Sequence, residues 1–216
     1  MKFIYAVIYL EPLLGLKTHK DLDFVLQDLQ NQYDILENVG VDGVLIENEN
    51  DRPYSLKANS AAISSMTYVL SKLVRRNKKI KLGLEFLIND PEASLSVAKV
   101  TDASFIRTDY FSDRMSREEY GGEIFSDPQG ILSWRSQIDA NHISIFTDIQ
   151  VKYAQMINPM SLEESAIKAV NAGSDGIIVT GSETGHAPTT EELAEAKKGC
   201  GNKPLIIGSG LSLIHI

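Results

Sequence analysis

The chain has 216 residues, of which 43% are hydrophobic and 23% charged, and it carries a formal net charge of −8 at pH 7. This length can bury a large core, whereas the acidic balance argues against a nucleic-acid-binding protein, which would present basic surface to phosphates. Cys200 is the only cysteine, so an intrachain disulfide is excluded, and no apolar run reaches the length of a membrane span.

Seven short apolar runs follow one another along the chain, and most have the composition of a strand that is covered on both faces. The first run follows Lys2, but Glu11 and Pro12 come after it without a small-residue cleavage site. We therefore interpret it as a strand and not as a signal peptide, and we expect a cytoplasmic protein. The runs are FIYAVIY (3–9), DGVLIE (42–47), IKLGLEF (80–86), ASFIRT (103–108), HISIFTD (142–148), DGIIVTG (175–181) and PLIIGSG (204–210).

Segments with helical signals lie between these runs. Residues 21–38 and 59–77 carry apolar side chains close to the i, i+3, i+4, i+7 spacing of an amphipathic helix. Ser161-Leu-Glu-Glu and Thr189-Thr-Glu-Glu read as capping boxes that begin two later helices. The longest interruption of this pattern is the loop 110–127.

The segments NVGVDG (38–43) and NAGSDG (171–176) repeat one pattern, in which a helix ends at glycine and Asp-Gly opens the next strand. Repeated strand-helix units predict a parallel sheet with right-handed crossovers. Seven units fit either an open doubly wound sheet or a (βα)8 barrel that lacks its last unit.

Polar side chains recur after the carboxyl ends of the predicted strands. In parallel α/β folds these ends share one rim, and that rim hosts the active site. The opposite ends hold little beyond Asp42, Asp102 and Asp175. The side chains expected at the rim are Glu11, Glu47, Asn48, Asp51, Glu85, Asn89, Asp90, Arg107, Asp109, Asp148, Lys152, Thr180, Ser182, Thr184 and Ser209.

Asp148 and Lys152 are candidates for proton transfer. Alternate residues of a strand share a face, so Asp148, Gln150 and Lys152 point the same way if the strand continues beyond residue 148. A carboxylate and an ammonium group tune the pKa of each other, and a desolvated lysine can form a Schiff base. A structural salt bridge is the alternative. The predicted catalytic residues are Asp148, Lys152 and Glu47, with Glu47 as a second candidate for the general base.

Arg107 is the candidate anchor for a substrate anion, because its planar fork suits a phosphate or carboxylate. Glu85 or Glu47 could instead hold it for structural reasons. The predicted substrate-binding residues are Asn48, Asp51, Asn89, Asp90, Arg107 and Asp109. No cofactor is expected, although Mg²⁺ would suit Glu47, Glu85, Asp109 and Asp148 if these carboxylates converge.

Glycine and hydroxyl residues after the last two runs are candidates for phosphate binding. Glycine lets backbone N–H groups approach an anion closely, although ordinary turns require glycine too. The predicted phosphate-binding residues are Thr180, Gly181, Ser182, Thr184, Gly185, Gly208, Ser209 and Gly210.

Six segments in order carry a family resemblance. They are YLEPLLG (9–15), ENENDRPY (47–54), EFLIND (85–90), FIRTD (105–109), DIQVKY (148–153) and VTGSETG (179–185). Together with Gly208-Ser209-Gly210 they resemble the BtpA/SgcQ family of ribulose-phosphate-binding-type barrels. The chain departs from the family pattern at Tyr9, Leu14, Glu85, Asp109 and Tyr153, several of which replace a family His or Asn, and this puts the family chemistry in question.

The resemblance implies that residues 1–210 form a single, incomplete (βα)8 barrel without its eighth βα unit. Residues 211–216 read Leu-Ser-Leu-Ile-His-Ile, which a common transposon-based sequencing adapter also encodes, so we expect a non-native tail there. The implied function is binding or conversion of a phosphorylated sugar or nucleoside-like small molecule at the rim. The alternative is an assembly factor of the photosystem I biogenesis type, without catalysis, associated peripherally with a membrane through the basic tract 75–79. Homo-oligomerisation stays open.

Overall fold

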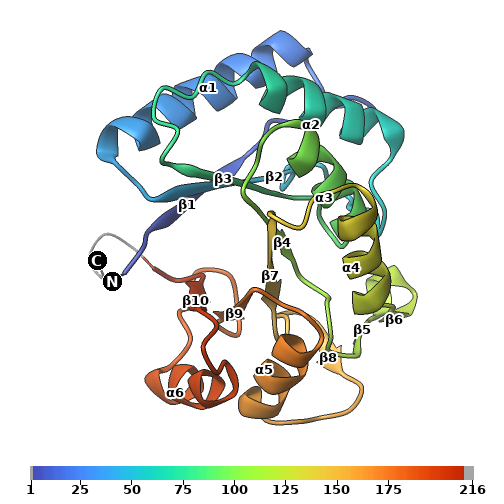
Figure 1. Ribbon diagram of the computed structural model, residues 1–216. Helices are drawn as coiled ribbons and strands as arrows, with labels where there is room; N and C mark the ends of the chain where they lie inside the picture. Colours follow the sequence, from blue (N-terminus) through green and yellow to red (C-terminus); the bar gives the residue numbers. More distant parts are fainter. Residues whose placement is uncertain (1, 212–216) are drawn as a thin grey trace. The chain divides into compact units, whose positions relative to one another are not determined.

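The computed structural model describes residues 2–211. Parallel strands alternate with helices along this part of the chain, and each of the seven predicted runs contains one parallel strand. The predicted fold class, an incomplete (βα)8 barrel, is confirmed. The elements are β1 (Tyr5–Tyr9), α1 (Leu22–Val39), β2 (Gly43–Glu47), α2 (Ser60–Lys72), β3 (Lys81–Glu85), α3 (Pro91–Val100), β4 (Phe105–Thr108), β5 (Met115–Arg117), the 3-10 helix η1 (Glu118–Tyr120), β6 (Gly122–Ile124), α4 (Pro128–Gln137), β7 (Ser144–Asp148), β8 (Gln155–Met156), α5 (Leu162–Asn171), β9 (Gly176–Thr180), α6 (Thr190–Gly199) and β10 (Leu205–Gly208) (Figure 1).

The chain forms two compact units. Unit 1 comprises the residues up to Ile106 together with Arg135–Ile143, and unit 2 comprises Arg107–Trp134 together with the residues from Ser144 onward. The single domain over 1–210 stays a prediction. Of the expected tail, residues 212–216 lie outside the described residues.

In unit 1, β1, β2, β3 and β4 pair in parallel in that order. Ile8, Ile46 and Leu84 stand in register on neighbouring strands and are at most 1% exposed. The alternate side chains of β1 are open, since Val7 is 44% and Tyr9 49% exposed. One face of this sheet therefore belongs to the core, and the other is accessible along β1.

An aromatic pair lies on the face of the unit 1 sheet that carries Val7 and Tyr9, near the amino ends of the strands. Tyr5 and Phe105 stack with ring centroids 5.3 Å apart. A Cβ atom on Gly43 would lie 2.4 Å from the Tyr5 ring, and one on Gly83 would lie 2.2 Å from the Phe105 ring. Both positions therefore require glycine, because the rings of the neighbouring strands occupy the space of a side chain.

In unit 2, β7, β9 and β10 pair in parallel, and α5 and α6 pack beside them. Both predicted capping boxes are confirmed. The side chains of Ser161 and Thr189 accept from the backbone N–H three residues on, and their own backbone N–H groups donate to the side chains of Glu164 and Glu192. The core here is built from small and branched side chains, namely Ile149, Ala166, Ala169, Ile177, Val179, Ala196 and Cys200.

The repeated Asp-Gly pattern has one structural explanation in both units. Asp42 N donates to Ile4 O, and Ile4 N donates to Asp42 Oδ2 at 2.8 Å. Asp175 makes the same reciprocal pair with Ile145, where the N–H to carboxylate distance is 3.1 Å. These two aspartates at the amino ends of strands therefore tie each strand to its neighbour.

The loop predicted over 110–127 contains structure that the sequence patterns did not reveal. β5 pairs antiparallel with β6 and with β8 in a small separate sheet. The 3-10 helix η1 and Gly121 form the turn of the β5–β6 hairpin, and Gly121 and Gly122, where β6 begins, have φ of 85° and 106°. Strands of two or three residues are too short to show a period of two, so hydrophobic periodicity could not find them.

Candidate functional site

Two buried carboxylates lie side by side at the carboxyl ends of the unit 1 strands. Tyr9, Glu47 and Glu85 stand in register on β1, β2 and β3. Glu47 is 4% and Glu85 1% exposed. Because side chains alternate along a strand, Glu47 and Glu85 lie on the same face of the sheet as the Tyr5–Phe105 pair. The two rings occupy this face toward the amino ends of the strands.

Asn48 and Asp51 tie together the loops that follow three strands. Asp51 Oδ1 accepts from Leu13 N at 2.9 Å in the loop after β1, and its Oδ2 accepts from Asn48 Nδ2 at 3.1 Å. Asn48 Oδ1 accepts from Leu87 N at 2.8 Å in the loop after β3. This network explains why the apolar strand β2 runs into consecutive polar residues, because their side chains satisfy the backbone of adjacent loops.

Burial raises the pKa of Asp51, and the hydrogen bonds from Leu13 N and Asn48 partly offset that effect. A carboxyl group with a raised pKa in the folded state adds stability below its unfolded pKa and loses that contribution as pH rises through the folded pKa. We compare the free energy of unfolding of the wild type with that of Asp51→Asn. The wild-type value minus the variant value should increase as pH falls from about 7 to about 4. Urea denaturation at several pH values measures this difference, and a constant or shrinking difference on acidification would contradict it.

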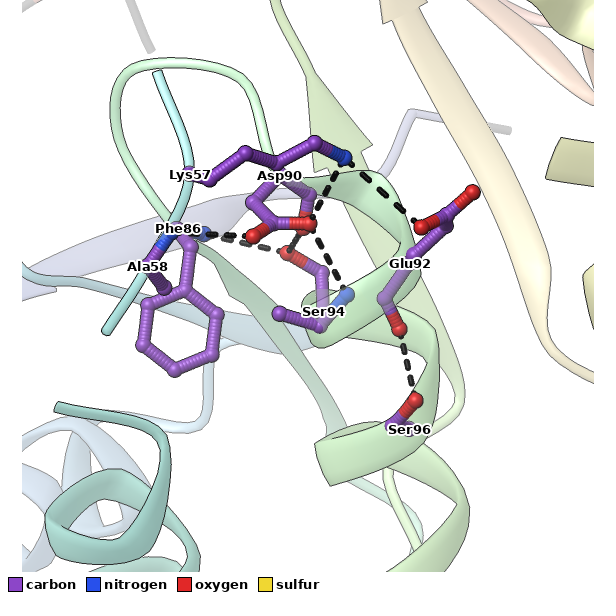
Figure 2. Close-up of polar contacts among 8 residues, drawn as sticks. Lys57, Ala58, Phe86, Asp90, Glu92, Ser94 and Ser96 are labelled. Carbon is purple, nitrogen blue, oxygen red and sulfur yellow. Dashed lines mark hydrogen bonds and ion pairs between the residues drawn. The ribbon is translucent and has the colours of Figure 1, made fainter. Parts of the chain in front are cut away.

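Asp90 holds a second connection in unit 1 (Figure 2). Its carboxylate caps the first turn of α3, accepts from Ala58 N at 2.9 Å and receives Lys57 Nζ at 3.3 Å. Ser94 Oγ donates to Asp90 O at 2.9 Å and accepts from Phe86 N at 3.1 Å. Asp90 thus joins the start of α3 to the segment before α2, and the adjacent Asn89 is 9% exposed.

Arg107 and Asp148 form a bidentate ion pair in unit 2. Arg107 Nε donates to Asp148 Oδ2 at 2.8 Å, and Nη2 donates to Asp148 Oδ1 at 2.9 Å. Asp109 Oδ1 lies 3.5 Å from Arg107 Nη2. The Asp148 side chain is only 2% exposed and that of Arg107 is 18% exposed, so the pair fixes a guanidinium group close to the protein surface.

The condition for a common face of Asp148 and Lys152, a strand that continues beyond residue 148, is not met. β7 ends at Asp148, and Gln150 takes a left-handed φ of 48°, so the alternation of the strand stops there. Asp113 Oδ2 accepts from Gln150 N at 3.0 Å and stabilises this turn. Within residues 2–211 Lys152 makes no hydrogen bond or ion pair, whereas both oxygens of Asp148 accept from Arg107.

The loops after β9 and β10, which carry the predicted phosphate-binding residues, are in direct contact. Gly208 pairs in register with Thr180, and Gly185 N donates to Ser209 Oγ at 3.3 Å. Ser182 and Thr184 are exposed.

Gly181 and Gly210 are required by close packing of the backbone. A Cβ atom on Gly181 would lie 2.2 Å from His186 O, and one on Gly210 would lie 2.1 Å from Ala187 N. These two glycines are thus explained by packing around the segment 186–187, whereas Gly185 meets no atom within 4 Å of its Cβ position.

Two further contacts were missed by sequence reasoning. Tyr153 Oη accepts from Thr184 N at 2.9 Å and donates to Thr184 Oγ1 at 3.2 Å. Its only sequence signal was the departure from the family pattern. Lys57 had no signal at all, because its partner Asp90 lies 33 residues away.

Two further findings concern metal ions and membranes. Within residues 2–211 no three His, Cys, Asp or Glu side chains gather as a metal ion would require. None of the helices in this stretch has both the length and the apolar character needed to cross a membrane.

Comparisons with known proteins agree with this architecture. The BtpA family model matches residues 1–216. An uncharacterized protein of Archaeoglobus fulgidus is 31% identical, covering 98% of this chain and 83% of that protein. The photosystem I biogenesis protein BtpA of Synechocystis is 28% identical, covering 96% and 72% of the two chains.

Solved structures with a similar fold include CdNal from Clostridium difficile in complex with mannosamine, with a TM-score of 0.56, 14% identity and coverage of 95% and 63%. Phosphoribosyl anthranilate isomerase from Thermus thermophilus has a TM-score of 0.52 at 8% identity and coverage of 98% and 78%. At these identities the likeness concerns the fold alone, and it supports the (βα)8-barrel class.

Proposed function

We propose that this chain, which belongs to the BtpA family, binds a small phosphorylated molecule of the sugar or nucleoside-like class at the carboxyl ends of its strands. The observation that supports this most is the contact between the loops after β9 and β10, where Gly185 N meets Ser209 Oγ. Backbone N–H groups of glycine-containing loops at this end of a parallel sheet are common phosphate ligands.

Arg107 is the proposed anchor for a second anionic or polar group of the ligand. Its bidentate pair with Asp148 holds the plane of the guanidinium group in one orientation. Because both carboxylate oxygens of Asp148 are engaged, we assign Asp148 as a positioning residue. The general-base role of Glu47 and the acid role of Lys152 stay predictions.

The test is a thermal-shift titration of the full 216-residue chain with ribose 5-phosphate and with ribose, at constant ionic strength. We expect the Tm to rise with the logarithm of the concentration of the phosphorylated sugar, with a stabilisation of about 2.7 kcal/mol at 100 times Kd, and no rise with ribose. Repeating the titration with other sugar phosphates and with nucleoside monophosphates covers the rest of the class. Failure of every phosphorylated compound to shift the Tm would overturn the proposal.

An assembly role is the second candidate, and the name of the Synechocystis relative favours it. The surface feature that the sequence offers for this role is the basic tract 75–79. Arg76 Nη1 bonds Asp34 Oδ1 at 2.9 Å, and Arg75 donates to Ile80 O at 3.1 Å. Two of its four cations are therefore engaged within unit 1, which favours ligand binding over membrane association.

A further inference from the structure

We propose that the Tyr153 hydroxyl competes with the ligand for the anion site, so that a phosphate group must displace it in order to bind. This inference rests on the proposed function and adds a residue that controls access to the site.

Two consecutive backbone N–H groups after β9 donate to side-chain hydroxyl oxygens and not to backbone carbonyls. Thr184 N donates to Tyr153 Oη at 2.9 Å, and Gly185 N donates to Ser209 Oγ at 3.3 Å. Adjacent N–H groups that point at oxygen atoms form a concave anion site, and the φ of 88° at Gly185 is typical of such a turn. The two hydroxyl oxygens thus occupy the positions that two oxygens of a phosphate would take.

The Tyr153 contact is open to solvent and reversible. Tyr153 is 58% exposed, and Thr184 and Gly185 are exposed as well. A hydrogen bond of this kind contributes a net stability of about 1 kcal/mol, which is small enough for a ligand to replace it. A charged phosphate oxygen is a stronger acceptor for the same N–H group than a phenolic oxygen.

The backbone at Tyr153 also favours release. Its φ of 64° lies in the left-handed region, which is uncommon for a bulky residue. Gln150, in the same loop, has a φ of 48°. A loop held in this conformation gains from relaxation once the hydroxyl bond is replaced.

Lys152 supplies the charge that selects an anion. It makes no ion pair within residues 2–211 and precedes Tyr153 directly. The hydrogen bonds to Thr184 lower the pKa of Tyr153, and the nearby Lys152 ammonium lowers it further. The chemistry that fits two N–H donors, a threonine hydroxyl and one ammonium is a dianionic phosphate monoester.

The test compares inorganic phosphate binding to the wild type, Tyr153→Phe and Tyr68→Phe by isothermal titration, with sodium chloride at equal ionic strength as the blank. Tyr153→Phe keeps the ring and removes the competing oxygen, so we expect phosphate affinity to rise by about five- to tenfold. Tyr68, 39% exposed on α2 in unit 1, is the matched control, and its variant should bind as the wild type does. Lys152→Ala should weaken binding in both the wild type and the Tyr153→Phe background.

Two results would overturn the inference, and they separate it from the proposed function. If phosphate binds the wild type and Tyr153→Phe binds equally or more weakly, the competition is wrong while the phosphate site stands. If neither protein binds phosphate although circular dichroism shows both to be folded, the inference and the proposed phosphate site fall together.

Discussion

Asp148→Ala is expected to lower the free energy of unfolding by about 3–5 kcal/mol, which is the range for breaking a buried ion pair by removing one partner. The Asp148 side chain is 2% exposed and accepts two hydrogen bonds from Arg107, of 2.8 and 2.9 Å. Removing the carboxylate leaves the guanidinium group without its bidentate acceptor in a largely buried position. Guanidinium denaturation monitored by circular dichroism measures the loss.

Asp109→Ala is the matched control for this prediction. Its carboxylate lies 3.5 Å from Arg107 Nη2 and is 15% exposed, so we expect a smaller loss, of about 1 kcal/mol. The double variant Arg107→Met with Asp148→Ala removes both charges and should recover much of the stability lost in Asp148→Ala. A single variant as stable as the wild type, or a double variant less stable than the single one, would show that the pair does not hold unit 2 together.

Gly83→Ala is expected to lower the free energy of unfolding by about 1–3 kcal/mol, as overpacking of a tight core does. The new Cβ atom would lie 2.2 Å from the Phe105 ring, which stacks on Tyr5 and has little room to move. The same measurement on Gly176→Ala should show a smaller loss, because the corresponding distance to the Phe146 ring is 2.9 Å.

Reducing the size of the ring tests the cause of the Gly83 effect. In a Phe105→Leu background the clash is relieved, so Gly83→Ala should cost less there than in the wild type. Equal costs in the two backgrounds would mean that the ring does not set the requirement for glycine. This pair also matters for the site, because the rings lie on the face that carries Glu47 and Glu85.

The strands of the barrel could be located from sequence because each is short, apolar and bounded by polar turns. The run at 42–47 became β2 (Gly43–Glu47), and every residue of that strand is buried. The helix starts at Ser161 and Thr189 could also be predicted from sequence, since a capping box is a contact between residues three apart in the chain. The short strands β5, β6 and β8 could not be predicted from sequence, because two or three residues are too few to show a hydrophobic period.

Contacts between polar side chains at the strand ends could not be predicted in the same way. Asp148 stands four residues before Lys152, yet its partner is Arg107, 41 residues away. Substrate binding by Asp51 stays a prediction, and the structure adds a contact that the sequence did not indicate, in which its carboxylate accepts from Leu13 N, 38 residues away. A polar residue type indicates that a hydrogen bond will form and carries no information about which distant group will supply it.

The sequence by itself determined the alternation of strands and helices and the family to which the chain belongs, because burial on both faces of a strand and local caps leave their mark on neighbouring residues. Only the tertiary structure decided what the polar side chains do: Asn48 and Asp51 support adjacent loops, Asp148 orients Arg107, and Tyr153 covers the N–H of Thr184. The physical reason is that these bonds join loops distant in the chain, and their geometry exists only once the parallel strands have brought those loops together.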